Sequence, residues 1–117
     1  MRLRREYYRS SLTPDLLQIL DLPQDELVAL VEQRHRDESE RFAYCRELGQ
    51  LASAERWESG KELGLVAARV GVDPRLLWLV EEGVLEIQDV PRKLPWDLER
   101  ELSITLPKIH LDLPETD

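Results

Sequence analysis

The stretch that most constrains the fold runs from Gly60 to Gly83, GKELGLVAARVGVDPRLLWLVEEG. Val66 and Val70 lie four residues apart and share one apolar face of a helix with 3.6 residues per turn. Gly71 follows, and glycine adopts the left-handed backbone conformation that ends many helices at little steric cost. The first half of the stretch therefore predicts a helix that ends at a tight glycine turn.

A second helix is predicted directly after this turn. Asp73 is suited to cap a helix N-terminus, and Pro74 follows at the first helical position, where its missing N–H costs nothing. The buried side of this helix is formed by apolar residues before the glycine that ends it: Leu76, Leu77 and Val80 before Gly83. The stretch as a whole predicts a helix-turn-helix.

The totals predict one all-α domain, a small helical bundle. The chain has 117 residues, of which 42% are hydrophobic, enough for an ordinary core. We divide it into a basic arm (1–11), a helical extension (12–52), the helix-turn-helix region (53–103) and an extended tail (104–117).

Several classes of function are not expected. The sequence has no apolar run long enough to span a membrane, no phosphate-binding or dinucleotide-binding motif and no nucleophile elbow. Cys45 is the only cysteine, and His35 and His110 lie far apart without partners at ligand spacing. We therefore expect no enzyme, cofactor, metal site or small-molecule substrate. The N-terminus has no apolar segment of a secretory signal, so a cytoplasmic location is expected.

The extension is predicted to be helical. Thr13 and Pro14 form a second cap and first-position pair, opening a short helix that ends near Pro23. A longer helix begins at Gln24 or Asp25. Residues 34–41, RHRDESER, contain no glycine or proline, so a continuous or slightly kinked helix is expected to run through them into an apolar pattern of threes and fours: Phe42, Cys45, Leu48, Leu51 and Ala52.

The C-terminal part is predicted to contain one more helix, over about 95–103, with Trp96, Leu98 and Leu102 closing the core. Residues 104–113 then alternate apolar and polar, with Pro107 between two opposite parities, which is typical of an edge or broken strand. Three fates stay open for this tail: pairing with its copy in a dimer, packing as an extended segment, or remaining loose.

Ser53 to Gly83 resembles the first three helices of the phage-repressor family, the Cro and lambda-repressor type also called XRE. The positions that match without a gap are Arg56, Gly60, Val66, Ala67, Gly71, Val72, Glu81 and Gly83. Pro91 to Leu102 looks like the family's fourth and fifth helices. The resemblance implies an ion pair between Arg56 and Glu81, and it implies a dimeric transcriptional regulator that binds duplex DNA.

The DNA-contacting positions of the family carry over only in part. The recognition helix of the family contacts base edges, and here Arg75 alone has a side chain suited to reading a base. Lys61 and Arg69 are candidates for backbone contacts, while Leu63 replaces a common phosphate-binding glutamine. The only basic region is the arm, with a net charge of +3 in a chain of net charge −8, which counts against simple DNA binding.

An alternative hypothesis starts from the apolar residues at these same positions. Leu63, Trp78 and Leu79 would form an exposed patch typical of a protein-binding surface, so the motif would serve protein interaction or self-association without DNA. A third interpretation places Trp78 in the core, since the second helix is apolar nearly all round and the extension is available to bury it.

Overall fold

Residues 12–107 are described by a computed structural model, and within them six α-helices and two short 3₁₀ turns follow one another without a β-strand. Their order is α2 (Pro14–Leu20), α3 (Gln24–His35), η1 (Glu40–Phe42), α4 (Ala43–Glu58), α5 (Leu63–Val70), α6 (Pro74–Glu82), η2 (Ile87–Asp89) and α7 (Leu94–Leu102). The predicted all-α class is confirmed. The arm (1–11) and residues 108–117, which include His110, lie outside the described residues.

Both predicted helix starts are present. The Thr13 hydroxyl accepts a hydrogen bond from the Leu16 N–H at 3.1 Å at the start of α2. The Asp73 carboxylate accepts one from the Arg75 N–H at 2.8 Å at the start of α6. Each cap satisfies a donor that the first turn of a helix cannot pair internally. The start and direction of α2 and α6 are thus fixed by their own sequences.

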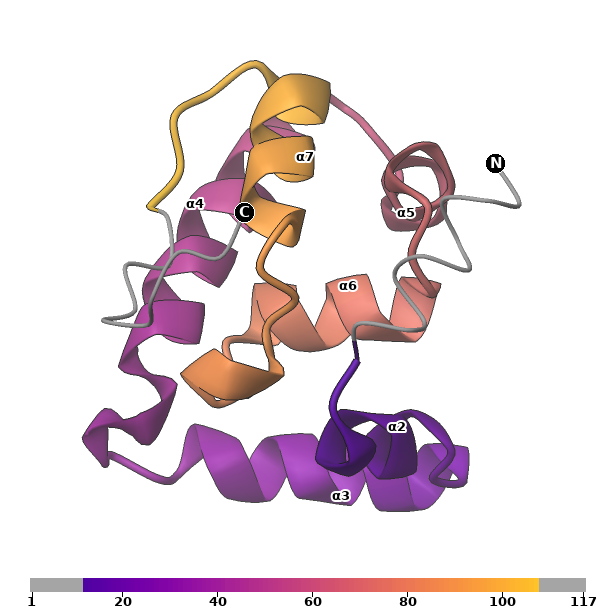
Figure 1. The fold of residues 1–117 in the computed structure, drawn as a ribbon, viewed down its shortest axis with the longest axis vertical. Helices are drawn as coiled ribbons and strands as arrows, with labels where there is room; N and C mark the ends of the chain where they lie inside the picture. The colour runs from indigo at the N-terminus through magenta and orange to yellow at the C-terminus, as the bar shows by residue number, and fades with distance from the viewer. Residues whose placement is uncertain (1–11, 108–117) are drawn as a thin grey trace, which may run out of the picture.

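Helix α6 occupies the centre of the bundle. Helices α3, α4 and α5 all pack against it, and Figure 1 shows α2 and α3 on one side of α6, α5 and α7 on the other, and α4 beyond one end. Its apolar residues are buried on every side: Leu76, Leu77, Leu79 and Val80. The sequence that reads as a recognition helix is therefore the core helix of this fold.

The closest packing of α6 is against α4 and depends on a glycine. A Cβ atom built at Gly49 would overlap the Val80 carbonyl oxygen and would lie 2.8 Å from the Glu81 carbonyl oxygen. Cys45, one turn earlier on α4, is wholly buried and directs its Sγ toward the Val80 carbonyl at 3.6 Å. Burial raises the pKa of the Cys45 thiol to about 11.

The predicted continuous helix through residues 34–41 is wrong. Helix α3 ends at His35 and α4 begins at Ala43. Between them, the Asp37 carboxylate accepts a hydrogen bond from the Ser39 N–H at 2.8 Å, and this bond holds the pKa of Asp37 below its usual range. Such local side-chain bonds offer the backbone an alternative to the helical pattern, so the chain turns here without glycine or proline.

The packing of Phe42 explains why the chain turns between α3 and α4. Its side chain is wholly buried, and the guanidinium groups of Arg34 and Arg41 lie over its ring at 5.2 and 4.9 Å. Arg46 also donates to the Ser39 carbonyl oxygen at 3.2 Å. A straight helix from α3 into α4 would separate these groups, whereas the turn buries the ring and stacks two cations on it.

The predicted helix over about 95–103 is present as α7, but its tryptophan faces outward. Leu98 and Leu102 are buried as predicted, whereas Trp96 is 55% exposed. The strand-like signal is not realised over residues 104–107, which form no strand although Leu106 is buried. Because no neighbouring strand is present among residues 12–107, the alternation has nothing to pair with there.

Candidate functional site

The helix-turn-helix segment has the local geometry that its sequence predicts. Gly71 ends α5 with φ +91° and ψ +30°, and its N–H donates to the Ala67 carbonyl oxygen. Gly83 ends α6 in the same left-handed region, with φ +70°. Two short helices and a glycine turn are therefore formed, and the question becomes which of their side chains reach solvent.

The ion pair implied between α4 and α6 is present. Arg56 Nε lies 2.6 Å and Nη2 lies 2.8 Å from the two carboxylate oxygens of Glu81, and the side chains are only 9% and 6% exposed. Arg56 Nη1 also donates to the Lys61 carbonyl oxygen at 2.9 Å. The hydrogen bonds that Arg56 donates to the Glu81 carboxylate raise the pKa of Arg56. The pair joins α4, α6 and the turn before α5.

Arg75, the candidate base-reading residue, is directed at the protein itself. Its guanidinium donates to the carbonyl oxygens of Leu20 at 3.1 Å and Leu22 at 2.7 Å, and to Gln24 Oε1 at 3.2 Å. These acceptors lie at the end of α2 and the start of α3. The side chain thus satisfies backbone carbonyls where one helix ends and ties the extension to the first turn of α6.

The two candidate phosphate contacts meet one acidic residue of α7. Lys61 donates to the Glu101 carbonyl oxygen at 2.8 Å, and its ammonium lies 3.9 Å from the Glu101 carboxylate. Arg69 lies 3.6 Å from the same carboxylate. Both cations are therefore partly neutralised. Residues 12–107 as a whole carry 11 Lys and Arg against 20 Asp and Glu, a net charge of −9.

The predicted apolar patch of Leu63, Trp78 and Leu79 is not exposed as a unit. Leu79 is wholly buried, so its place in the patch is wrong. Leu63 and Trp78 are partly buried and pack against the core. The physical reason is that α6 is enclosed by helices on several sides, including α3 of the extension, as the third interpretation expected.

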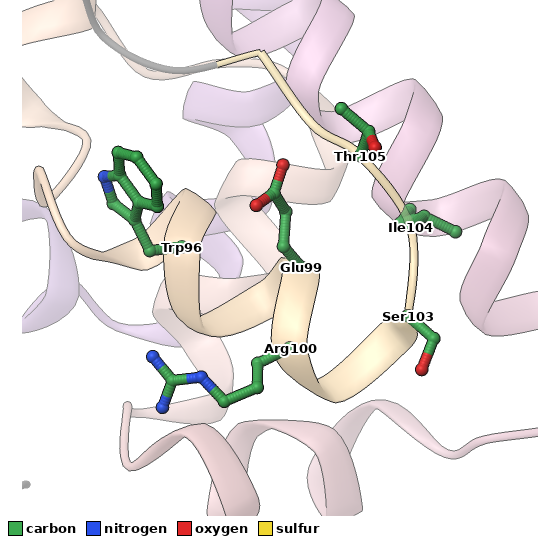
Figure 2. A pocket seen from close by; sticks show the side chains of 6 residues that line it. All are labelled: Trp96, Glu99, Arg100, Ser103, Ile104 and Thr105. Carbon is green, nitrogen blue, oxygen red and sulfur yellow. The ribbon is translucent and has the colours of Figure 1, made fainter.

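The described surface instead exposes other large apolar side chains. Trp57 at the end of α4 is 71% exposed, and Trp96 on α7 is 55% exposed. The Arg56 guanidinium lies 5.3 Å from the centre of the Trp57 ring. Trp96 lines an open groove of about 490 Å³, which we call the α7 groove. Its other lining residues are Glu99, Arg100, Ser103, Ile104 and Thr105 (Figure 2).

The groove has two walls from consecutive parts of the chain. The first is the outer face of α7, where Trp96, Glu99, Arg100 and Ser103 recur at helical spacing opposite the buried Leu94, Leu98 and Leu102. The second is the segment after α7, which turns back at Ser103 in the left-handed conformation, φ +58°. The helical spacing was visible in the sequence, but the returning segment was not.

Hydrogen bonds hold the second wall in place. The Glu99 carboxylate accepts from the Leu106 N–H at 2.7 Å, and the Tyr44 hydroxyl donates to the Pro107 carbonyl oxygen at 2.8 Å. Because Leu106 is buried at the same time, the segment is fixed both by apolar contact and by polar bonds at its far end. The α7 groove is thus a formed feature of the surface with an exposed indole at one side.

No protein-family model, curated protein or solved structure matches this chain. Among residues 12–107, no helix is long and apolar enough to cross a membrane, and no three His, Cys, Asp or Glu side chains gather as metal ligands would. The assignment of function therefore depends on the side chains themselves.

Proposed function

We propose that the protein is a protein-interaction module that binds a partner through the α7 groove and does not read duplex DNA through α6. The observation that carries the proposal is the position of Arg75, whose guanidinium is bound to the carbonyl oxygens of Leu20 and Leu22. Arg75 is the one side chain on α6 suited to contact the edge of a base, and its guanidinium is bound to the protein's own backbone.

The burial of α6 supports the same conclusion. A recognition helix must present a polar face to the major groove, which is about 12 Å wide. The five successive positions 76–80 of α6 are all apolar and together go round the helix, and all of them but Trp78 are buried. The net charge of −9 over residues 12–107 adds repulsion from phosphate, since nucleic-acid affinity comes largely from neutralising the backbone.

The α7 groove has the features of a protein contact. It combines an exposed tryptophan with an arginine, and its other lining residues are the polar Glu99, Ser103 and Thr105 and the apolar Ile104. Tryptophan and arginine are the residue types that most often dominate the binding energy of interfaces. Trp96 supplies apolar area and Arg100, whose side chain is 71% exposed, supplies a charge at the groove.

The test compares two tryptophans. Full-length protein is immobilised, and the proteins retained from an extract of its source cells are quantified by mass spectrometry for wild type, Trp96→Ala and Trp57→Ala. Both side chains are largely exposed, so each variant is expected to fold. We expect Trp96→Ala to lose a specific set of proteins by at least about tenfold, as for a hot-spot residue, and Trp57→Ala to keep it. Equal retention by all three would overturn the α7 groove as the binding site.

The regulator hypothesis has its own measurement. Full-length protein is incubated with a random duplex library at low salt, and bound DNA is selected and titrated with salt. We expect no enriched sequence. A selected duplex whose affinity falls steeply with salt, and falls further in Arg75→Ala, would instead favour a transcriptional regulator that uses α6.

A further inference from the structure

We propose that the partner bound at the α7 groove is an extended segment with a large aliphatic residue, and that it displaces residues 103–107, which fill the same place in the free protein. We call these residues the strap. The inference rests on the proposed function for the groove as a binding site. It starts from the contacts that hold the strap, which are one buried side chain and two hydrogen bonds from side chains to its backbone.

The strap is held as a bound peptide would be held. Leu106 is 2% exposed, and its side chain belongs to the hydrophobic core, in a position that we call the socket. The Glu99 carboxylate accepts from the Leu106 N–H at 2.7 Å, and the Tyr44 hydroxyl donates to the Pro107 carbonyl oxygen at 2.8 Å. Side chains of α7 and α4 thus bind two backbone groups of the strap on either side of its aliphatic anchor.

These contacts define what a partner must carry. Every peptide has N–H and C=O groups, so Glu99 and Tyr44 are suited to bind an extended chain of any sequence. The socket adds selectivity, because an aliphatic side chain gains by leaving water there, whereas a polar one would lose its hydrogen bonds to water. Trp96 is exposed three residues before Glu99 on α7, and in Figure 2 Glu99 lies between Trp96 and the strap. The indole therefore adds apolar surface beside the same site.

Few contacts hold the strap for its length. Ser103, where the strap leaves α7, has φ +58°, a left-handed conformation that costs free energy for residues other than glycine. Ser103 and Thr105 are exposed, and Ile104 is only partly buried. The gain from one buried leucine and two hydrogen bonds is opposed by the conformational entropy lost on ordering the strap, and these contributions are similar in size. Such a segment opens locally while the helices stay folded.

A partner competes with the strap for the same contacts. Because the strap is joined to α7, it competes at an effective concentration in the millimolar range. A free segment that offers only the groups of the strap is therefore excluded, and a partner must add contacts, for which Trp96 and Arg100 line the groove. The strap thus limits binding to partners that cover both the socket and the exposed indole.

Hydrogen exchange of the full chain, followed by NMR, tests the opening. We expect the Leu106 amide to exchange at least about a hundredfold faster than the amides of the buried Leu77 and Val80 in α6. Its rate is also expected to change little in dilute urea, because local opening exposes little surface, whereas the α6 rates rise. A Leu106 amide that exchanges as slowly as those of α6, with the same dependence on urea, would overturn the proposal.

Peptide binding tests the socket. The probe is a peptide with the sequence of the strap, SITLP, blocked at both ends and titrated by NMR into wild type, Leu106→Ser and Leu65→Ser. Leu65 lies on α5, is 46% exposed and does not line the groove, so its variant makes the same substitution elsewhere. We expect Leu106→Ser to bind SITLP with a Kd at least about tenfold below that of wild type and of Leu65→Ser, because its own strap no longer fills the socket. The peptide SITSP is expected to bind none of the three.

Equal Kd values for SITLP in wild type and Leu106→Ser would contradict displacement of the strap. Equal binding of SITLP and SITSP to Leu106→Ser would contradict the aliphatic socket. Circular dichroism checks that Leu106→Ser is folded, and Leu106→Ala, a milder truncation, replaces it where it is not. The exchange experiment on wild type depends on no variant.

The inference and the proposed function fail separately. If Leu106→Ser binds SITLP but the retention of cellular proteins ignores Trp96→Ala, the displaceable strap stands and the proposed function fails. If retention depends on Trp96 but Leu106→Ser binds SITLP no better than wild type and retains no more partner, the inference fails and the proposed function stands. We expect Leu106→Ser to retain severalfold more partner than wild type.

Discussion

The ion pair between Arg56 and Glu81 gives the sharpest stability prediction. The perturbation is Arg56→Met, which keeps the length and apolar stem of the side chain but removes its charge and its donors. Three hydrogen bonds are lost: two to the Glu81 carboxylate, at 2.6 and 2.8 Å, and one to the Lys61 carbonyl oxygen, at 2.9 Å.

The magnitude follows from burial. The Glu81 side chain is 6% exposed, so the variant leaves a carboxylate in the interior without its counter-charge. Removing one partner of a buried pair typically costs about 3–5 kcal/mol. Domains of this size have a total stability of roughly 5–15 kcal/mol, and one kcal/mol shifts Tm by about 3–6 °C. We therefore expect Tm to fall by at least about 10 °C.

The assays are thermal unfolding, which gives Tm, and urea unfolding, which gives the free energy of unfolding, both followed by far-UV circular dichroism, with Glu81→Leu and the double variant completing a mutant cycle. The double variant is expected to be more stable than Arg56→Met, because it removes the stranded charge. Arg100→Met serves as the control, since the Arg100–Asp97 pair has a largely exposed arginine and surface pairs contribute little. A loss below about 1 kcal/mol in Arg56→Met, or no coupling in the cycle, would refute the reasoning.

Three further predictions follow from packing and titration. Gly49→Ala is expected to lose more than about 3 kcal/mol of unfolding free energy in urea titrations, or to fail to fold, because the added Cβ overlaps the Val80 carbonyl oxygen. The added Cβ of Gly64→Ala meets no atom, so this variant is expected to gain about 0.5–1 kcal/mol. The pKa of the Cys45 thiol is about 11 in the folded protein and about 8.5–9 in the unfolded chain. We therefore expect the free energy of unfolding to fall by roughly 2–3 kcal/mol as the pH rises from 9 to 11, and to fall less steeply in Cys45→Val. Arg75→Met is expected to lower hydrogen-exchange protection at the end of α2, measured by mass spectrometry, with unchanged protection there contradicting the assigned contacts.

The features predicted well from the sequence are those decided by neighbouring residues. Thr13 and Asp73 cap helices because a short side-chain oxygen reaches an N–H two or three positions on. Gly71 ends α5 because the left-handed conformation is cheap only for glycine. The Arg56–Glu81 contact is a long-range one, and it was reached through a family resemblance, not from the residues alone.

The features missed depend on backbone geometry and on packing that residue type and periodicity do not specify. The break before α4 contains no glycine or proline, and it depends on Asp37 bonding to Ser39 and on the burial of Phe42. The α7 groove depends on a serine in the left-handed conformation and on Glu99 accepting from Leu106. Periodicity gave the face of α7 correctly but could not say that the chain would return along it, so Trp96 was assigned to the core.

Helix α6 explains why the motif predicts fold more securely than function. The same features that define a helix-turn-helix locally, a cap, a glycine turn and an apolar stripe, are satisfied whether the remaining face meets solvent or protein. Here the remaining face is apolar as well, and the extension covers it. The Arg75 guanidinium donates instead to the carbonyl oxygens of Leu20 and Leu22 in the extension. A DNA-binding role for α6 would require breaking these bonds and exposing Leu76 and Leu79 to water, a loss that an arginine contact worth about 1–3 kcal/mol does not offset.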